Sequence, residues 1–246
     1  MRISMIICLL MVFALQINAQ PLEEMEYILR FGFIKGGKAT LTAQNEKLNK
    51  KQTIHYRMRG KTTGLVDKLF EVNDVYESWV DPLTFLPVKS LRNVKEQKYR
   101  FYDEVIYDQK NDSVFSLKKG RKKVPKNVND LVSVFFFIRQ NKYFEQMLAG
   151  KEIDIPVFHG DELFIMHLAY LGTKTIDTKI GRKLCYVVSP QVPKGKLLKG
   201  SDDLRIYITA DANRLPIYAE FSLTLGSLKC ELNEYKIGGV NQLISQ

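Results

Sequence analysis

Residues 27–41 have the sequence YILRFGFIKGGKATL, and this stretch decides the expected fold. Tyr27, Leu29 and Phe31 occupy alternate positions, and large apolar side chains with this period are typical of a β-strand. The segment Lys35-Gly36-Gly37 is typical of a turn in which glycines take positive φ angles. We therefore expect a β-hairpin whose turn lies at these three residues.

The same alternation recurs along most of the chain. Apolar-polar segments are separated by turn signals such as Asp81-Pro82 and Asn111-Asp112. We expect strands at residues 54–58, 72–80, 86–94, 99–107, 114–117, 153–157, 163–171, 184–188, 204–209, 216–225 and 228–237. About a dozen strands at close spacing indicate an antiparallel, mainly β protein.

One segment departs from this pattern. Asn129 is typical of a helix N-cap, with Asp130 in the first turn. Residues 131–138 are apolar on nearly every side, which is typical of a buried helix, and the helix can continue to Leu148 after a break at Asn141. We expect a single domain of curved antiparallel sheet, an open half-barrel or β-roll, with one central buried helix around residues 129–148.

The N-terminus has the three parts of a secretory signal peptide. Arg2 supplies a positive charge, residues 3–15 are nearly all apolar, and Ala19 is a small residue at the expected cleavage site. The apolar stretch is shorter than the roughly 20 residues that a membrane-spanning helix needs. We expect residues 1–19 to be removed and residues 20–246 to form the single β-rich domain. Such a protein is exported to the periplasm or the outer cell envelope.

The composition is that of an ordinary globular protein, with 45% hydrophobic and 26% charged residues. This balance excludes a disordered chain and a disulfide-dense miniprotein. The formal net charge is +10, and part of it is clustered. The candidate anion-binding residues are Lys118, Lys119, Arg121, Lys122 and Lys123. The cluster suits an anionic envelope surface, or it is a solvated loop. Nucleic acid is not expected as a partner of an exported protein.

Aromatic side chains are abundant, with 14 Phe, 12 Tyr and one Trp. Aromatic residues on a curved sheet can line a pocket for a sugar or an acyl chain. Each of them can equally fill the core of a β-sheet protein. The candidate ligand-binding residues are Tyr76, Trp79, Phe101, Phe135, Phe136 and Phe137.

No motif for catalysis is present. The chain has neither a Gly-x-Ser-x-Gly nucleophile signature nor a Gly-rich phosphate loop, so we expect no catalytic residue and no cofactor. Adjacent carboxylates on a strand point to opposite faces, but Asp103 or Asp202 could meet another carboxylate across strands. That arrangement would suit a polysaccharide-active enzyme.

The histidines and cysteines give no clear site. His55, His159 and His167 match no compact metal-ligand spacing, so no metal is expected. Cys185 and Cys230 lie in strand-like segments. They could form a disulfide or stay free thiols, because the sequence does not determine the distance between them.

Residues 206–217, IYITADANRLPI, contain an Asp-x-x-Arg-x-Pro turn formed by Asp211, Arg214 and Pro216. The turn and the Gly-Ser step that follows at residue 226 resemble the closing signature of an exported bacterial family known as domain of unknown function 3108. Further similarities lie at residues 36–39, 73–81 and 130–133, and at Arg139.

The resemblance spans about residues 22–240. It implies an envelope protein with a curved antiparallel sheet, similar in shape to periplasmic lipoprotein carriers. The roles of Asp211, Arg214 and Pro216 are expected to be structural. Asp211 and Arg214 suit a turn held by a local ion pair or by side-chain-to-backbone hydrogen bonds, and Pro216 fixes the start of the next strand.

These features together predict an exported envelope protein that binds an amphiphile or a glycan on a concave sheet, without catalysis. The expected partner is a lipid, a lipoprotein or a glycan. Two alternatives stay open. One is a polysaccharide-active enzyme, and the other is a partner-binding scaffold, which a large exposed apolar patch would favour.

Overall fold

The computed structural model describes residues 22–140, 143–191, 203–223 and 226–242. The expected leader, residues 1–19, and Asp202 lie outside these ranges. The strands are β1 Glu23–Phe31, β2 Ile34–Leu48, β3 Lys51–Thr62, β4 Asn73–Val80, β5 Pro87–Glu96, β6 Tyr99–Asp108, β7 Ser113–Ser116, β8 Gly120–Lys123, β9 Ile153–His159, β10 Glu162–Thr178, β11 Gly181–Gln191, β12 Leu204–Thr209, β13 Pro216–Leu223, β14 Gly226–Ile237 and β15 Val240–Asn241. The helices are α1 Gly64–Leu69, α2 Ser133–Gln140 and α3 Tyr143–Leu148.

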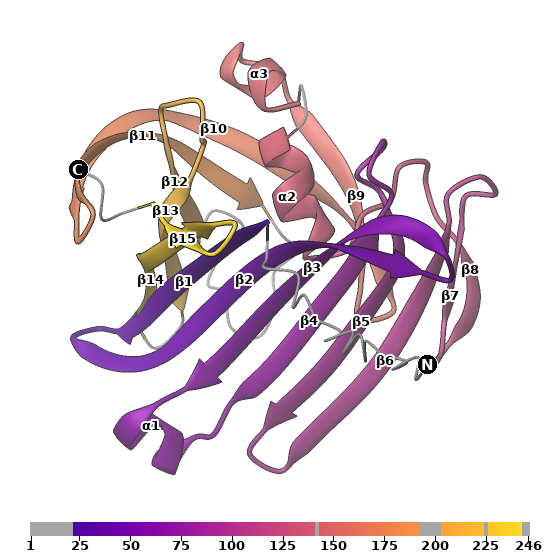
Figure 1. Cartoon of the computed structure of the whole chain (residues 1–246), viewed down its shortest axis with the longest axis horizontal. Coiled ribbons are helices and arrows are strands. Elements are labelled where there is room, and N and C mark those ends of the chain that lie inside the picture. Colours follow the sequence, from indigo (N-terminus) through magenta and orange to yellow (C-terminus); the bar gives the residue numbers. More distant parts are fainter. Residues whose placement is uncertain (1–21, 141–142, 192–202, 224–225, 243–246) are drawn as a thin grey trace, which may run out of the picture.

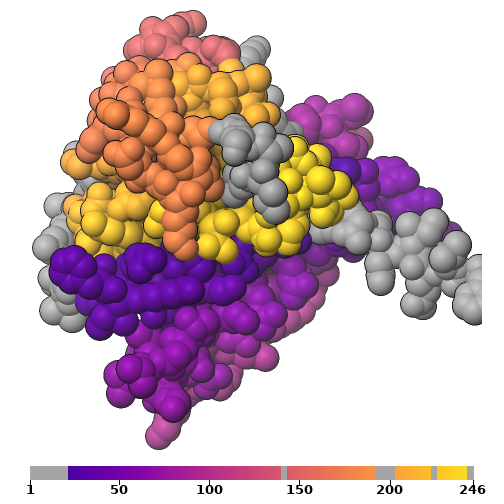
Figure 2. All heavy atoms as spheres, turned by 60° about the vertical axis from the view of Figure 1, so that its left-hand side comes forward, coloured from indigo at the N-terminus to yellow at the C-terminus, as the bar shows by residue number. Residues whose placement is uncertain are grey.

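All of these strands belong to one antiparallel sheet. Its order is β8-β7-β6-β5-β4-β3-β2-β1-β14-β13-β12-β11-β10-β9, and β15 pairs with β14. Neighbours in the sheet are thus neighbours in sequence except where β1 pairs with β14 and joins the two halves. In Figure 2 the yellow C-terminal strands lie directly against the indigo N-terminal strands at this junction. The predicted mainly β, antiparallel fold is confirmed.

The sheet is strongly curved but open, with β8 and β9 as its edges (Figure 1). The segment that leads from β8 to α2 pairs with β9. The backbone N–H of Asn129 donates to the carbonyl of Pro156, and the N–H of Phe158 donates to the carbonyl of Asn129, both at 2.8 Å. Apolar side chains from both edges meet in one cluster, formed by Val105, Tyr107, Val114, Val124, Val128 and Phe158. The result is the expected open half-barrel.

The central helix begins later than the sequence suggests. The carboxylate of Asp130 accepts hydrogen bonds from the backbone N–H groups of Val132 and Ser133 at 2.8 and 2.9 Å. The hydroxyl of Ser133 in turn accepts the N–H of Asp130 at 3.0 Å. Asp130 therefore caps α2, and the predicted cap, Asn129, is held outside the helix by its pairing with β9.

The helix α2 lies inside the curve of the sheet (Figure 1). Phe136 is fully buried and stacks on Tyr56 of β3, with 3.9 Å between the ring centres. Phe137 and Ile138 are buried in a second apolar cluster, against β9, β10 and β11. The prediction of a buried central helix is confirmed, with the chain dividing it into α2 and α3. No helix in the described ranges is both long and apolar enough to cross a membrane.

The first hairpin differs from the prediction. Its turn lies at Gly32 and Phe33, where Gly32 has a φ angle of +57°, and Gly36 and Gly37 lie within β2. A Cβ atom on Gly37 would come 2.7 Å from the carbonyl oxygen of Lys61 on β3. Gly37 is therefore required by the close approach of two backbones and not by a positive φ angle.

Cys185 and Cys230, the cysteines in the described part of the chain, are free thiols. Cys185 is fully buried in the apolar cluster that contains Tyr56 and Phe136, and Cys230 packs against the same cluster. Burial raises the pKa of Cys185 to about 11 and that of Cys230 to about 12. Both side chains therefore act as small apolar groups, which settles the alternative that the sequence left open.

Candidate functional site

A cleft opens on the inner face of strands β4, β5 and β6. The start of the helical segment and the turn between β9 and β10 form its other walls. The cleft has about 400 Å³ of space, its mouth included. Its charged, polar and aromatic walls are formed chiefly by Tyr76, Ser90, Arg92, Phe101, Asp103, Asp130, Phe158 and His159.

Arg92 is the central side chain of the cleft. Its guanidinium carbon lies 4.7 Å from the centre of the Phe101 ring and 5.8 Å from that of Tyr76. Its Nε atom is buried and has no hydrogen-bond partner in the described part of the chain. None of the ion pairs between described residues involves Arg92. Arg92 as a whole is half-buried, but a buried Nε donor without a partner is unusual in a protein.

Two lysines of the predicted basic cluster border the same cleft. The Nζ atom of Lys118 lies 5.5 Å from the centre of the Phe101 ring, so this ring contacts two cations. The Nζ atom of Lys122 lies 5.7 Å from the Phe158 ring and donates to the carbonyl of Asp161 at 2.5 Å. Lys122 thereby ties the edge strand β8 to the β9–β10 turn.

The rest of the basic cluster lies away from the cleft. Arg121 donates to the hydroxyl of Ser113, and Lys123 donates to the carbonyl of Asn111, both at 3.1 Å. Lys119 is exposed in the turn between β7 and β8. The solvated loop that the sequence suggested is in part a strand, because residues 120–123 form β8. Lysines on an edge strand also hinder pairing with another chain.

The two carboxylates of the cleft are held in place by hydrogen bonds. Asp103 accepts from the hydroxyl of Ser116 at 3.1 Å and from the N–H of Lys118 at 3.2 Å. Asp130 caps α2 and also accepts the hydroxyl of Ser78 at 2.5 Å. Burial raises the pKa of Asp130, although these hydrogen bonds favour its charged form. Both carboxylates therefore have a structural role at the bottom of the cleft.

His159 completes the wall opposite Arg92. Its ring lies 5.9 Å from that of Tyr76. Burial, helped by the positive charge of Arg92, lowers the pKa of His159 to about 4. The imidazole is therefore neutral near pH 7, and the positive charge at the cleft comes from Arg92 and the two lysines.

The other histidines lie elsewhere. His55 is on the outer face and forms an ion pair with Glu46 at 2.7 Å when protonated. His167 is exposed and lies 2.5 Å from Asp154. Within the described ranges, no group of three or more His, Cys, Asp or Glu side chains is arranged to hold a metal ion.

The predicted aromatic residues divide into three groups. Tyr76 and Phe101 line the cleft. Trp79 stacks on His55 at 4.4 Å, and its indole N–H donates to Glu46 at 3.0 Å. Ser78, one residue before Trp79, pairs with Tyr56, which faces the helix. Because successive side chains alternate, Trp79 lies on the outer face, away from the cleft.

The helix aromatics belong mainly to the core. Phe136 and Phe137 are buried, and only Phe135 is partly exposed, edge-on to Phe136 at 5.2 Å. A ligand could not reach Phe136 or Phe137 without displacing α2. Arg92, Ser90 and Phe158 line the cleft but were not predicted from the sequence as ligand-binding residues, and His159 was considered there only as a possible metal ligand. The available signal for Arg92 was a charge at an inward position between Ser90 and Val94.

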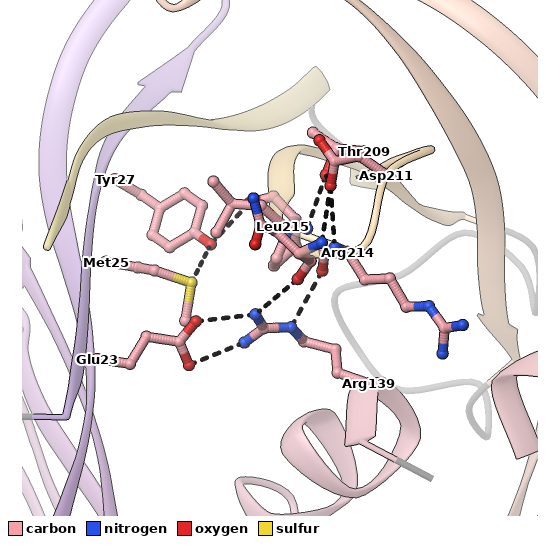
Figure 3. A network of polar contacts seen from close by, with 10 residues as sticks. Glu23, Met25, Tyr27, Arg139, Thr209, Asp211, Arg214 and Leu215 are labelled. Atoms are coloured by element: carbon pink, nitrogen blue, oxygen red, sulfur yellow. Dashed lines mark hydrogen bonds and ion pairs between the residues drawn. The ribbon is translucent and has the colours of Figure 1, made fainter. Parts of the chain in front are cut away.

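The Asp-x-x-Arg-x-Pro turn is held by side-chain-to-backbone hydrogen bonds (Figure 3). Asp211 accepts the backbone N–H of Asn213 at 2.9 Å and that of Arg214 at 3.2 Å, and the hydroxyl of Thr209 at 2.9 Å. Arg214 does not pair with Asp211. It forms an ion pair with Glu145 of α3, and its guanidinium carbon lies 4.6 Å from the Phe144 ring. Of the two alternatives, backbone capping is the one that occurs.

The carbonyl groups of this turn also anchor the central helix. Arg139 of α2 donates to the carbonyl of Arg214 at 3.1 Å and forms a bidentate pair with Glu23 of β1, at 2.8 and 3.1 Å (Figure 3). Tyr27 donates to the carbonyl of Pro216 at 2.7 Å. The turn, the first strand and the helix thus form one network, which fixes the helix at the junction of the two halves of the sheet.

Comparison with known proteins identifies a solved structure with a similar fold and the family of the chain. No curated protein matches the sequence. A crystal structure described as a β-barrel-like protein of domain of unknown function DUF1849, from Brucella abortus, is similar, with a TM-score of 0.57 and 11% sequence identity. The match covers 89% of this chain and 98% of that chain, and at this identity it shows a common fold alone. A family model described as "Protein of unknown function (DUF3108)" matches residues 26–233. The chain therefore belongs to the DUF3108 family.

Proposed function

We propose that this chain is an exported binding protein of the cell envelope that holds the anionic group of an amphiphile or a glycan in the cleft around Arg92. The observation that carries the proposal is the arginine itself. It is half-buried against two aromatic rings, it forms no ion pair with a carboxylate in the described ranges, and its buried Nε donor is unpaired. A phosphate or carboxylate placed there would receive charge-assisted hydrogen bonds from a planar, preoriented donor.

The surroundings of Arg92 support an anion and not a cation. Lys118 and Lys122 add positive charge at the border of the cleft, and His159 is uncharged near pH 7. Asp103 and Asp130 are already engaged by hydroxyl and backbone donors. Without the open space at its mouth the cleft holds only about 30 Å³, which suits a small anionic group and not a whole lipid. The flat face of a sugar or the first carbons of a chain could pack on Tyr76 or Phe101.

Binding of dodecyl phosphate, compared with dodecyl maltoside, tests this function. The two probes share a twelve-carbon chain and differ in head-group charge. We expect saturable binding of dodecyl phosphate by calorimetric titration, with an affinity at least about tenfold lower for Arg92→Gln, since a charged hydrogen bond contributes about 1.5–3 kcal/mol.

The matched control is Arg59→Gln. Arg59 is an exposed arginine on β3 that donates to Asn73, and it lies outside the cleft. Its replacement should leave the affinity unchanged. Equal binding of the neutral and the anionic probe, or equal loss in both variants, would contradict the proposal.

A second function, hydrolysis of a polysaccharide, has one observation in its favour. Asp103 and Asp130 line the same cleft, and burial raises the pKa of Asp130, as in a general acid. Hydrolysis of a cell-wall polysaccharide by the wild-type protein that is lost in Asp103→Asn, in which Arg92 is intact, would support it. If the wild-type protein binds dodecyl phosphate and hydrolyses no polysaccharide, the binding function is favoured.

A further inference from the structure

A second surface of the molecule, far from the cleft, carries an unusual group of exposed apolar side chains. It is the end of the sheet where the β1–β2 turn, α1 and the β5–β6 turn lie side by side along the lower edge in Figure 1. We call this end the rim and define it as residues 31–36, 61–71 and 96–100. The exposed apolar side chains of the rim are Phe31, Phe33, Ile34, Leu65, Leu69, Phe70 and Tyr99.

The three segments of the rim are in direct contact. The N–H of Thr63 donates to the carbonyl of Gly36 at 2.9 Å, which joins α1 to the first hairpin. The N–H of Gln97 donates to the carbonyl of Glu71 at 2.8 Å, and its side-chain amide donates to the carbonyl of Leu69 at 3.1 Å. The rim is therefore one continuous surface that three separate parts of the chain build.

Several apolar side chains of the rim are almost completely exposed to solvent. Phe33 is fully exposed, and Leu65 and Leu69 are 75% and 80% exposed. Leu65 and Leu69 are four residues apart and share one face of α1, while Val66 packs on Gly36. The short helix contains no buried residue. These side chains project outward, and no described segment covers them.

The charges between the apolar side chains indicate what the rim contacts. Lys35, Lys61, Lys68, Lys98 and Arg100 outnumber Asp67, Glu71 and Glu96. Lysine is depleted in the centre of protein interfaces. Lysines interspersed with Phe and Leu are instead typical of a surface that lies in the head-group region of an anionic bilayer.

We propose that the rim is a peripheral membrane-binding surface, which inserts Phe33, Leu65 and Leu69 into the outer part of an anionic lipid layer. The lysines of the rim would lie at the level of the head groups. One end of the strands would then face the membrane. This inference does not depend on the cleft, because the two surfaces share no residue.

Flotation with lipid vesicles tests the proposal. The protein is expressed with its whole coding sequence and purified as the host processes it. We expect binding to vesicles of phosphatidylcholine and phosphatidylglycerol in a 3:1 ratio, and weaker binding to phosphatidylcholine alone. The triple variant Phe33→Ser, Leu65→Ser, Leu69→Ser should bind at least about tenfold more weakly, since it loses three insertable apolar side chains.

Leu83 supplies the matched control. It is 88% exposed but lies in the β4–β5 turn, at the opposite end of the strands. Leu83→Ser should leave vesicle binding unchanged. Lys35→Gln with Lys68→Gln should lower binding to the anionic vesicles and leave binding to the neutral vesicles unchanged.

A tryptophan reporter keeps the test independent of any loss of folding in the triple variant. The only tryptophan of the chain, Trp79, is buried on the sheet. In the Phe33→Trp protein, brominated phosphatidylcholine should quench the added fluorescence, whereas in the Leu83→Trp protein it should not.

Three results would overturn the proposal. They are an absence of vesicle binding by the wild type, unchanged binding by the triple variant, and equal quenching at both reporter positions. A dimer that the triple substitution dissociates, detected by light scattering in the absence of vesicle binding, would assign the rim to a second copy of the chain instead.

Discussion

Arg92 and Phe101 are diagonal neighbours on the inner face of β5 and β6, and the guanidinium carbon lies 4.7 Å from the centre of the ring. Such a cation-π contact contributes about 0.5–2 kcal/mol, depending on solvation. The contact is made by the flat face of the guanidinium and does not use the Nε–H donor. The Nε donor has no partner in the described ranges, and the proposed anion site rests on this feature.

The pair between Glu23 and Arg139 should be the most sensitive ionic contact of the fold. Both side chains are largely buried, with exposures of 15% and 9%. Arg139→Gln should lower the free energy of unfolding by about 3 kcal/mol, because it leaves a buried carboxylate without its partner. Urea denaturation followed by Trp79 fluorescence measures this. Arg100→Gln, at an exposed arginine, should change stability by less than about 0.5 kcal/mol. A similar effect of the two substitutions would contradict the account.

The Asp211 turn makes a second prediction. Asp211→Ala should lower the free energy of unfolding by about 1–2 kcal/mol, because two backbone N–H groups lose their acceptor. Arg214→Ala should have an effect below about 1 kcal/mol, because Glu145, its ion-pair partner, is 61% exposed and the pair is screened by solvent. Thermal denaturation of both variants provides the comparison, and the opposite order would show that the arginine holds the turn.

Two strand glycines should respond differently to alanine. Gly37→Ala should lower stability by about 1–3 kcal/mol, because its Cβ would come 2.7 Å from the Lys61 carbonyl oxygen. Gly60→Ala, on the adjacent strand, has no atom within 4 Å of the added Cβ and should be neutral or slightly stabilising. Midpoints of urea denaturation distinguish the two. An equal loss at both positions would mean that flexibility, and not the close approach, selects glycine at position 37.

The low pKa of His159 predicts a pH-dependent stability. The folded-state pKa is about 4, below the value of about 6.5 expected for the unfolded chain. As the pH falls from about 6.5 towards 4, the unfolded chain gains a proton that the folded chain does not. The free energy of unfolding should therefore decrease, by at most about 1.4 kcal/mol per pH unit.

Urea denaturation between pH 7 and pH 5 checks this, with His159→Gln as the reference. The variant should lose this part of the slope. Asp130, whose pKa burial raises, contributes with the opposite sign, but it is present in both proteins and cancels in the comparison. Identical slopes in the two proteins would refute the assignment.

Local periodicity was sufficient to predict much of the fold. The expected strand 204–209 coincides with β12, and the apolar segment after Asn129 contains the buried helix. The same alternation also determines which aromatic side chains can share a face of the sheet. Tyr76 and Trp79 are three residues apart on one strand, so they lie on opposite faces and cannot line one pocket.

Long-range pairing could not be predicted from local patterns. The pairing of β1 with β14 joins residues about two hundred positions apart, and it decides that Arg139 meets Glu23. The cleft has the same origin. Arg92 and Phe101 come from adjacent strands, but His159 reaches the site only because the sheet curves and the β9 edge returns towards β8. The role of Gly37 likewise depends on the distance to a carbonyl of another strand.

The most direct test of the central claim is the ¹H–¹⁵N spectrum of the arginine side chains during titration with dodecyl phosphate. The Nε–H of Arg92 has no partner in the described ranges, so binding of the phosphate should move its signal in a saturable way. The Nε–H of Arg59, which donates to Asn73 at 3.2 Å, should not move. A saturable shift of Arg92 alone is the predicted result. An unchanged Arg92 signal at saturating probe would contradict the proposed anion site.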